Sequence, residues 1–316
     1  MRADPEIAVV VPAHDAGETI AATLAALADQ DLDRPFELIV VDDRSSDRTA
    51  AIAGQQGAKV VRLTDQLGPG AARNAGVSAT GAEIIAFTDA DCEPARTWLK
   101  EGIAAIERGA DVVTGPIEPV RRPGPFDRTL NVRGPSPLFE SANVFVRRST
   151  FDRLGGFHRP ARLDLPVEAG HFGEDVVFGW RAVRAGARTA YAEGAVVRHA
   201  VFPRDARGYV AERWRLRFFP MLVGEVPELR RSRPLRLFLS PRTARFDLAL
   251  AGLAVAVARR RVLPLVAVVP YARRDLRRRQ FWRRSVARRN AAYVLGDLVG
   301  LAGLLYGSVV HRRPLL

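Results

Sequence analysis

Residues 83–92 read EIIAFTDADC, an apolar run followed at once by two aspartates, Asp89 and Asp91. A short apolar run with β-branched residues predicts a buried strand. Acidic side chains are depleted from strands, and two like charges held this close repel each other. The stretch therefore predicts a strand that ends at a site for a cation.

The sequence around this stretch alternates between two periods. Short apolar runs predict strands over residues 7–12, 36–43, 58–63, 82–89 and 110–115. Apolar residues at helical spacing between them predict helices over residues 19–30, 46–57, 71–81 and 96–109. Strands alternating with helices at this spacing predict an α/β, Rossmann-like, mostly parallel sheet flanked by helices on both faces.

After Gly115 the alternation ends, and the composition changes again from about Met221. Residues 116–137 carry six prolines and read as a long loop. The chain has 316 residues, of which 47% are hydrophobic, so it is long enough for a large domain with an appendage. We expect a catalytic domain over residues 1–220 and a helical, arginine-rich, apolar region over residues 221–316.

Acidic residues follow several of the predicted strands. Asp42 and Asp43 end the second strand, and Asp89 and Asp91 end the fourth. The carboxyl ends of parallel strands form one rim, where ligands of open α/β sheets bind. Mg²⁺ and Mn²⁺ prefer oxygen ligands and bridge carboxylates to phosphates, so the rim predicts a site for a metal and a diphosphate. An isolated D-x-D is also typical of a solvated turn.

Five motifs resemble those of family 2 glycosyltransferases with the GT-A fold, in the same order and at similar spacing. They are VVVPAHDAGETI, LIVVDDRSSDRTA, GPGAARNAGV, IIAFTDADC and GEDVVFGWRAVRAG, and the resemblance covers about residues 5–200. It implies an inverting transfer of a sugar from a nucleotide diphosphate sugar, helped by a divalent cation, Mg²⁺ or Mn²⁺.

The resemblance also implies which residues bind the nucleotide. Asp43 matches the aspartate that hydrogen-bonds the base, and the backbone of Pro12 and Ala13 matches the turn that cradles it. Arg73 and Asn74 match the loop that lies along the nucleotide.

The same resemblance implies the metal ligands. Asp89 matches the first acid of the D-x-D motif, near the ribose, and Asp91 matches the metal ligand. His199, 24 residues after Asp175, matches a histidine that relatives use as a further metal ligand, although a lone histidine is as often structural.

The base of an inverting transfer must lie opposite the leaving diphosphate. Asp175, at the start of a predicted helix, matches the family's base, and its neighbour Glu174 is expected to position the acceptor. The helix dipole stabilises a carboxylate at this place, and an ordinary helix cap is the alternative. Arg181, six residues on, faces either the diphosphate or a salt-bridge partner.

Processive members of the family carry a Q-x-x-R-W signature after the base. Here Arg213 and Trp214 are preceded by Val210 where the glutamine would be. This departure favours a single addition over polymer synthesis. We expect the acceptor to be a glycan or a lipid-linked molecule, bound in a site that the loops over residues 116–137 and 155–173 shape.

The apolar runs of the C-terminal region differ in their suitability for a membrane. Leu248–Pro270 contains Arg259–Arg261, which would cost ~8–10 kcal/mol at the centre of a bilayer, so we reject it as a simple span. Ala291–Val310 has the length of a single C-terminal span and one charge, Asp297. Its pairs Gly296/Gly300 and Gly303/Gly307 have the spacing used in close helix packing.

The segment over residues 273–289 interleaves arginines with Leu276, Phe281 and Trp282. This pattern favours contact with an anionic membrane surface over a solvated basic helix or nucleic-acid binding. No nucleic-acid partner is expected. The net charge of +13 and the predominance of arginine suit phosphate-bearing partners.

The N-terminal apolar run of about five residues is too short for a signal peptide. Cys92 is the only cysteine, which fits a reducing compartment. We therefore expect the protein on the cytoplasmic face of a membrane.

Three other function classes compete with the glycosyltransferase. A sugar nucleotidyltransferase would carry a G-x-G-x-R-x-x-P signature after the first strand, and none is present. A non-catalytic membrane- or nucleic-acid-binding protein with a degenerate fold would have no need of Asp89, Asp91 and Asp175. A dinucleotide oxidoreductase is disfavoured because no G-x-G-x-x-G follows the first strand.

Overall fold

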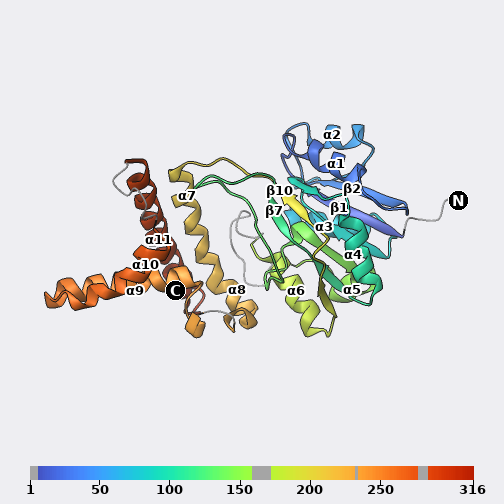
Figure 1. Cartoon of the computed structure of the whole chain (residues 1–316). Helices are drawn as coiled ribbons and strands as arrows, with labels where there is room; N and C mark the ends of the chain where they lie inside the picture. The colour runs from blue at the N-terminus through green and yellow to red at the C-terminus, as the bar shows by residue number, and fades with distance from the viewer. Residues whose placement is uncertain (1–5, 159–171, 232–233, 277–283) are drawn as a thin grey trace. The chain divides into compact units, whose positions relative to one another are not determined.

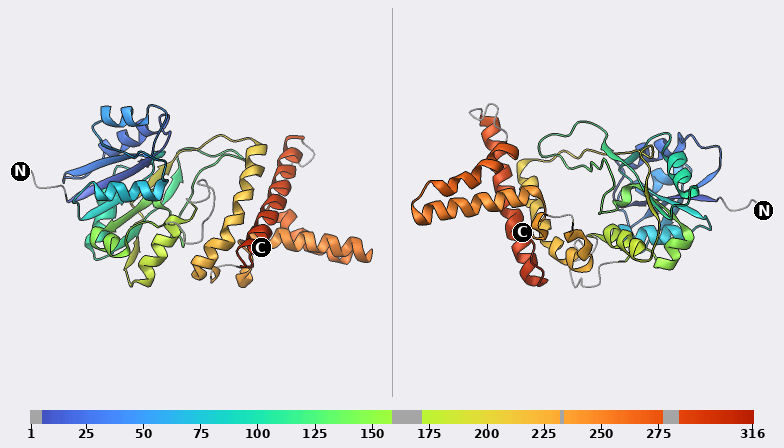
Figure 2. Two further views of the ribbon diagram at one scale, coloured as in Figure 1. Left: turned by 180° about the vertical axis from the view of Figure 1, so that it is seen from behind. Right: turned by 60° about the horizontal axis from the view of Figure 1, so that its bottom comes forward.

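The computed structural model describes residues 6–158, 172–231, 234–276 and 284–316 (Figure 1; Figure 2). The predicted acceptor loop over 155–173 lies outside these residues except at its ends, as do Phe281 and Trp282 of the predicted basic segment. The chain forms two compact units. One comprises Met1–Pro123 and Arg128–Phe202, and the other Gly124–Asp127 and Pro203–Leu316.

The first unit contains all the strands of the described chain. They are β1 (Ile7–Ala13), β2 (Phe36–Asp42), β3 (Lys59–Arg62), β4 (Ile84–Phe87), β5 (Cys92–Pro94), β6 (Val112–Thr114), β7 (Ile117–Pro119), β8 (Val144–Arg147), β9 (Thr189–Tyr191) and β10 (Val197–His199). Its helices are α1 (Ile20–Ala28), α2 (Thr49–Gln55), α3 (Pro69–Ser78), α4 (Trp98–Glu107), the 3₁₀ turn η1 (Ser141–Asn143), α5 (Arg148–Leu154) and α6 (Glu174–Arg184). The five strands and four helices predicted for the first 115 residues are confirmed.

The strands form a seven-stranded and a three-stranded sheet. The larger has the order β3-β2-β1-β4-β8-β6-β9, and the smaller β5-β10-β7. Neighbouring strands of the larger sheet are parallel except for β8, which is antiparallel to both β4 and β6. The mostly parallel sheet is confirmed. The chain leaves the sheet after β6 and returns as β8 in the opposite direction, so β4 and β6 are separated.

The core of this unit lies on both faces of the larger sheet. Ile7, Val9 and Val11 of β1 pack with α1 and α4, whereas Ala8 and Val10 pack with residues of α3, α5 and α6. Successive side chains of a strand point to opposite faces, so every residue of β1 is buried. This double burial explains why the strand is apolar throughout rather than alternating.

The second unit is helical in its described part. It comprises α7 (Ala206–Glu212), η2 (Arg213–Phe218), α8 (Phe219–Glu225), η3 (Pro227–Arg230), η4 (Pro234–Arg236), α9 (Pro241–Arg259), η5 (Leu263–Ala267), α10 (Val268–Arg274) and α11 (Arg284–Val310). The predicted boundary at residue 220 falls inside α8. The composition shift on which it rested begins after α7 and η2, but both of these pack against α11 and so belong to the second unit.

Helix α11 uses small residues to approach its neighbours. An added Cβ at Gly296 would lie 2.7 Å from the Tyr209 ring, and one at Gly307 would lie 2.0 Å from the carbonyl oxygen of Arg217. Gly300 and Gly303 face the same segment. The small-residue spacing read from the sequence therefore serves the contact between α11 and the α7–η2 segment. By length and composition, α11 is the one helix of the described chain suited to crossing a membrane, and 33% of its most apolar window is buried within the protein.

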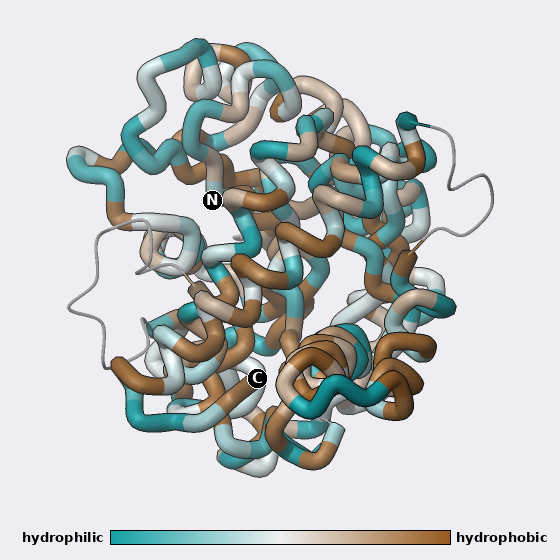
Figure 3. The backbone as a smooth tube through the Cα atoms, turned by 90° about the vertical axis from the view of Figure 1, so that its left-hand side faces the viewer, coloured by the Kyte–Doolittle hydropathy of each residue, from teal (hydrophilic) through white to brown (hydrophobic). Residues whose placement is uncertain are grey.

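Helices α9 and α10 form a hairpin with η5 (Figure 1; Figure 2). The chain turns between α9 and η5, where Arg260 adopts a left-handed conformation at φ 49°. Leu248–Pro270 is therefore two antiparallel segments, which agrees with its rejection as a simple span. In Figure 3, which looks toward the tip of this hairpin, a hydrophilic stretch at the tip lies in front of helical turns that are mostly hydrophobic.

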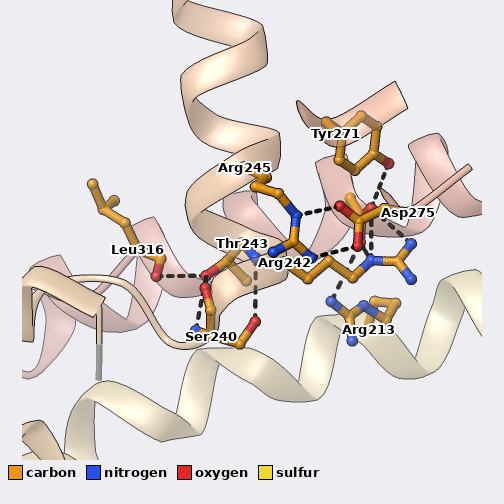
Figure 4. A network of polar contacts seen from close by, with 9 residues as sticks. Arg213, Ser240, Arg242, Thr243, Arg245, Tyr271, Asp275 and Leu316 are labelled. Carbon is orange, nitrogen blue, oxygen red and sulfur yellow. Dashed lines mark hydrogen bonds and ion pairs between the residues drawn. The ribbon is translucent and has the colours of Figure 1, made fainter. Parts of the chain in front are cut away.

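A charged network holds the base of the hairpin to α11. Asp297, 5% exposed, accepts hydrogen bonds from Arg242 at 2.8 Å and from the Tyr271 hydroxyl at 2.6 Å. Beside it, Arg245 pairs with Asp275 at 2.6 Å (Figure 4). The charge that reduced the suitability of 291–310 for a membrane is thus neutralised within the protein.

Candidate active site

The carboxyl ends of β2, β1 and β4 lie side by side, because these strands are neighbours and parallel. A cavity of about 500 Å³ opens beside them. Its walls carry carboxylates from several segments of the chain. These are Asp15, Glu18, Asp89, Asp91, Glu174 and Asp175. Such a concentration of negative charge calls for cationic groups in the protein or in a ligand.

One cationic group in the protein is Arg73 on α3. Its guanidinium forms an ion pair with Asp89 and lies 5.5 Å from the centre of the Phe157 ring. Arg73 is 4% exposed. The sequence-predicted residues Arg73 and Asp89 are therefore brought together, and one oxygen of Asp89 is already bound by an internal cation.

Asp91 lies next to His199. The pairing of β10 with β5 places His199 opposite Cys92, and the His199 Nε2 atom lies 3.7 Å from an Asp91 carboxylate oxygen. The Nδ1 atom lies 2.7 Å from the Ala200 carbonyl oxygen, which only accepts, so Nδ1 carries the proton. The Nε2 atom consequently faces Asp91, which is where an imidazole nitrogen and a carboxylate oxygen can share a metal ion.

Ligand atoms of Asp91, Cys92 and His199 lie within 4.8 Å of one another. Burial raises the pKa of the Cys92 thiol well above its ordinary value, so this residue is a neutral thiol. Burial, and then the nearby Asp89, raise the pKa of Asp91 as well. A partly buried carboxylate beside a like charge and an imidazole nitrogen fits a divalent cation, held by Asp91 and His199.

Asp175 and Glu174 begin helix α6, but their surroundings differ. Glu174, 4% exposed, accepts a hydrogen bond from the Gly70 amide at 2.8 Å and so joins α6 to the first turn of α3. An added Cβ at Gly70 would lie 2.2 Å from the Glu174 carboxylate, so a side chain there would displace this carboxylate. Asp175 lines the cavity, and its carboxylate accepts from the Val176 amide at 2.9 Å. Burial raises the pKa of Asp175 to about 6, against the lowering effect of the Val176 amide and Arg73.

Three residues predicted to touch the nucleotide make contacts outside the cavity lining. Asp43 accepts from the Leu67 and Gly68 amides, both at 2.7 Å, and thereby fixes the loop before α3. Asn74 bonds to both the amide and the carbonyl of Phe157. Arg181 donates to the carbonyls of Leu154 and Gly156 at the end of α5.

The remaining predicted positions divide between the cavity and the core. Pro12 lines the cavity, whereas Ala13 is 4% exposed and packs in the core beside it.

The Glycosyl transferase family 2 profile matches residues 8–158. These residues form a family 2 glycosyltransferase domain. The match covers β1 to the end of α5 and includes Asp89, Asp91 and Arg73. The domain is an enzyme that transfers a sugar from a donor to an acceptor, which favours this function over the nucleotidyltransferase and the non-catalytic alternatives.

Known glycosyltransferases are similar to this chain over part of their length. "Glycosyltransferase AglE" of Haloferax volcanii is 29% identical over 216 residues, covering 63% of this chain and 68% of that protein. "Uncharacterized glycosyltransferase Rv0539" of Mycobacterium tuberculosis is 37% identical over 114 residues, or 36% of this chain. The stretch shared with that protein spans about half of its length, 50%.

Solved glycosyltransferase structures share the fold. The mannosyltransferase PcManGT from Pyrobaculum calidifontis, in complex with GDP-Man and Mn²⁺, superposes with a TM-score of 0.61 at 22% identity, covering 95% of this chain and 88% of that one. S. aureus TarS 1-349 in complex with UDP-GlcNAc gives a TM-score of 0.51 at 18% identity, covering 98% and 92%. At these identities the likeness establishes the GT-A fold.

The cavity is also lined by a cationic side chain, that of Arg128, which sequence analysis did not suggest. Arg128 lines it from the proline-rich loop, where its backbone pairs with that of Phe202 at 3.0 Å and its guanidinium lies 5.2 Å from the centre of the Phe202 ring. Its charge acts to lower the pKa of Asp91. No motif surrounds Arg128, so only the pairing of two distant segments reveals it.

Proposed function

We propose that this protein transfers a sugar, with inversion, from a nucleotide diphosphate sugar to an acceptor hydroxyl in one displacement assisted by Mg²⁺ or Mn²⁺. One observation carries the proposal. Asp175, whose pKa burial raises to about 6, lines the same cavity as Asp91 and Arg128. A base with a pKa close to neutral beside a site for an anion and its cation is what this reaction requires.

The donor half of the site uses the β4 end of the cavity. Asp91 and His199 would hold the cation, with Asp89 beside them, and the cation when bound would offset the charge of the leaving diphosphate. Arg128 would contact the phosphoryl oxygens. The complexes of PcManGT with GDP-Man and of TarS with UDP-GlcNAc support a nucleotide diphosphate sugar as the donor class.

The contacts of the remaining predicted residues support an indirect role. Asp43 fixes the loop that leads into α3, and Asn74 fixes α3 to the segment at Phe157. Both would keep Arg73 in place along the nucleotide. Pro12 lines the cavity and remains a candidate for direct contact with the base.

In the transfer step, the acceptor oxygen bonds to the anomeric carbon while the bond from that carbon to the diphosphate oxygen breaks. The bonding electrons leave with the diphosphate, and the hydroxyl proton passes to Asp175. Glu174 acts as a positioning residue, because its bond to Gly70 fixes the first turn of α6. The single attack from the face opposite the leaving group inverts the anomeric configuration.

The proposed acceptor is a glycan or a lipid-linked molecule at the cytoplasmic face of a membrane, which receives one sugar at a time. Residues 203–316 hold 25 arginines and no lysine against seven acidic residues, which favours contact with anionic lipid. Val210 lies four residues before Trp214, where processive relatives would have a glutamine, and this favours the addition of a single sugar.

A panel of nucleotide sugars tests the proposal directly. We expect at least one donor to raise the melting temperature in the presence of Mn²⁺ and to be hydrolysed slowly without acceptor, since water can replace the acceptor hydroxyl. NMR of the first product formed would show the inverted anomer. Retention of configuration, or donor binding that is indifferent to Mn²⁺, would contradict the mechanism.

A further inference from the structure

The α9–η5–α10 hairpin has an unusual composition. Between Leu248 and Pro270 every residue is apolar, glycine or proline, except Arg259–Arg261 at the turn. Of the 21 large hydrophobic side chains exposed in the described chain, ten lie in this segment. Val257 is 71% exposed, Val262 81% and Val266 65%. Scattered exposed aliphatic residues are ordinary, but this concentration marks a contact surface.

The hairpin has its small residues inside and its large residues outside. Ala249, Gly252 and Ala256 are the buried positions of this part of α9, and Gly252 faces the returning segment. An added Cβ at Gly252 would lie 2.6 Å from the Pro264 carbonyl oxygen and 2.7 Å from the Ala267 Cβ. Helices in water bury their large side chains, whereas small residues at the helix contact are typical of packing in lipid.

The charges around the hairpin indicate which kind of partner contacts its apolar surface. Arg259–Arg261 are exposed at the turn, and Arg273 and Arg274 are exposed at the other end of the apolar stretch. Exposed aliphatic side chains lie on both segments, with Leu253 and Val257 on α9 and Val266 on the returning segment. Apolar surface bounded at both ends by arginine complements the acyl chains and phosphates of anionic lipid.

The length of the hairpin limits how it can enter a bilayer. The eleven residues from Leu248 to Ala258 rise about 16 Å at 1.5 Å each, roughly half of the ~30 Å hydrocarbon core. Entry tip first would leave Arg259–Arg261 in the hydrocarbon. Lying along the interface keeps the arginines at both ends level with the headgroups while the aliphatic side chains reach the acyl chains.

We propose that residues 248–270 form an interfacial membrane anchor, lying in one leaflet with Arg259–Arg261 and Arg273–Arg274 on anionic headgroups. The inference rests on the membrane contact of the proposed function and identifies the segment that makes it. It is separate from α11, whose small-residue face packs within the second unit.

Flotation of the full chain with vesicles tests the anchor. The hairpin variant is Leu253→Gln with Val257→Gln, and the matched control is Leu235→Gln with Val183→Gln, which removes one exposed leucine and one exposed valine elsewhere. With vesicles of phosphatidylcholine and phosphatidylglycerol, we expect the hairpin variant to partition at least ~tenfold more weakly and the control to match wild type. Equal flotation of hairpin variant and wild type would overturn the proposal.

The arginines are tested in the same assay. Arg259→Ser with Arg260→Ser and Arg261→Ser should weaken binding to vesicles containing phosphatidylglycerol. The control triple Arg62→Ser, Arg108→Ser and Arg153→Ser removes the same charge from exposed positions of the first unit and should not. Equal losses in the two triples would mean that net charge alone directs binding, against the proposal.

Two further measurements distinguish loss of the membrane anchor from loss of a dimer and from failure of the catalytic unit. Light scattering without vesicles should show the same oligomeric state for wild type and the hairpin variant, since a dimer lost in the variant would assign the hairpin to a second copy of the chain and overturn the proposal. Binding of nucleoside diphosphate with Mn²⁺ reports on the catalytic unit without lipid. Its retention in the hairpin variant distinguishes loss of the anchor from failure of the proposed function.

Discussion

Replacing Asp175 by asparagine should make the enzyme slower and the fold more stable at the same time. Asparagine keeps the size of the side chain and still accepts a hydrogen bond from the Val176 amide, which Asp175 does at 2.9 Å. It removes the proton-accepting power and the negative charge. General-base catalysis contributes typically ~10²- to 10⁴-fold, so kcat should fall by that factor. Donor and Mn²⁺ binding should change little, because they depend on Asp91, His199 and Arg128.

The stability gain follows from the raised pKa. The pKa of Asp175 is about 6 in the folded protein against an ordinary value of 3.8. As pH rises from about 4 to about 6, the unfolded chain loses this proton while the folded chain keeps it, so wild-type stability falls over that range and the loss persists above it. The upper limit is about 3 kcal/mol, and water in the cavity reduces it to about 1 kcal/mol.

The pH dependence of kcat gives the same pKa independently. The ionised form of Asp175 is the active base, so kcat should be half-maximal near pH 6 and fall about tenfold for each pH unit below that value. Arg73, which lowers the pKa of Asp175, and Glu140, which raises it, are the charged groups acting on it. The acidic limb should be absent from the residual activity of Asp175→Asn.

Steady-state rates at saturating donor and acceptor, with denaturant unfolding at pH 4 and pH 7.5, provide both measurements. The variant should match wild-type stability at the lower pH and exceed it at the higher. Glu174→Gln is the matched comparison, because it removes the neighbouring charge while leaving an oxygen for the Gly70 amide. Turnover of Asp175→Asn within a few-fold of wild type would refute the assignment of the base and leave Glu174 as the next candidate.

Three further predictions concern other charges. Asp91→Asn should weaken Mn²⁺-dependent binding of nucleoside diphosphate in calorimetry by at least ~tenfold, and unchanged affinity would contradict the metal assignment. Arg128→Gln should weaken binding of nucleoside diphosphate about tenfold but leave nucleoside binding unchanged, and an equal loss for both ligands would argue against a phosphoryl contact. Asp297→Asn should destabilise the second unit by about 1–3 kcal/mol in denaturant unfolding, because the partly buried Arg242 would lose its charge partner; a loss below about 0.5 kcal/mol would show that the network is solvated.

The sheet and its rim could be predicted because their signals are local. Each strand of the larger sheet in the first 115 residues lies in a short apolar run, and the acidic residues at the ends of β2 and β4 follow directly in sequence. Parallel pairing then brings these ends together without further information. The insertion of β8 between β4 and β6 could not be read in this way, since antiparallel return after a long excursion leaves no mark on the strand itself.

The parts of the site that sequence reasoning missed depend on distant pairings. Arg128 reaches the cavity only because its backbone pairs with Phe202. Arg181 resembles a ligand of the diphosphate by position in its motif, but carbonyl groups at the end of α5 are within its reach and bind it instead. The domain boundary was placed at a change of composition, whereas helices 206–218 join the second unit through glycines some 80 residues further along the chain.

Helix α3 connects the two halves of the catalytic cavity. Its first turn is bonded to Glu174, next to the proposed base, and its middle carries Arg73, bound to Asp89 beside the proposed cation ligand. A side chain at Gly70 would displace the Glu174 carboxylate and break the first of these contacts. Donor recognition and proton removal therefore cannot diverge independently as this enzyme acquires new substrates. Substitutions in the 116–137 loop can change which acceptor binds. A substitution that moves α3 would alter the binding of donor and acceptor together.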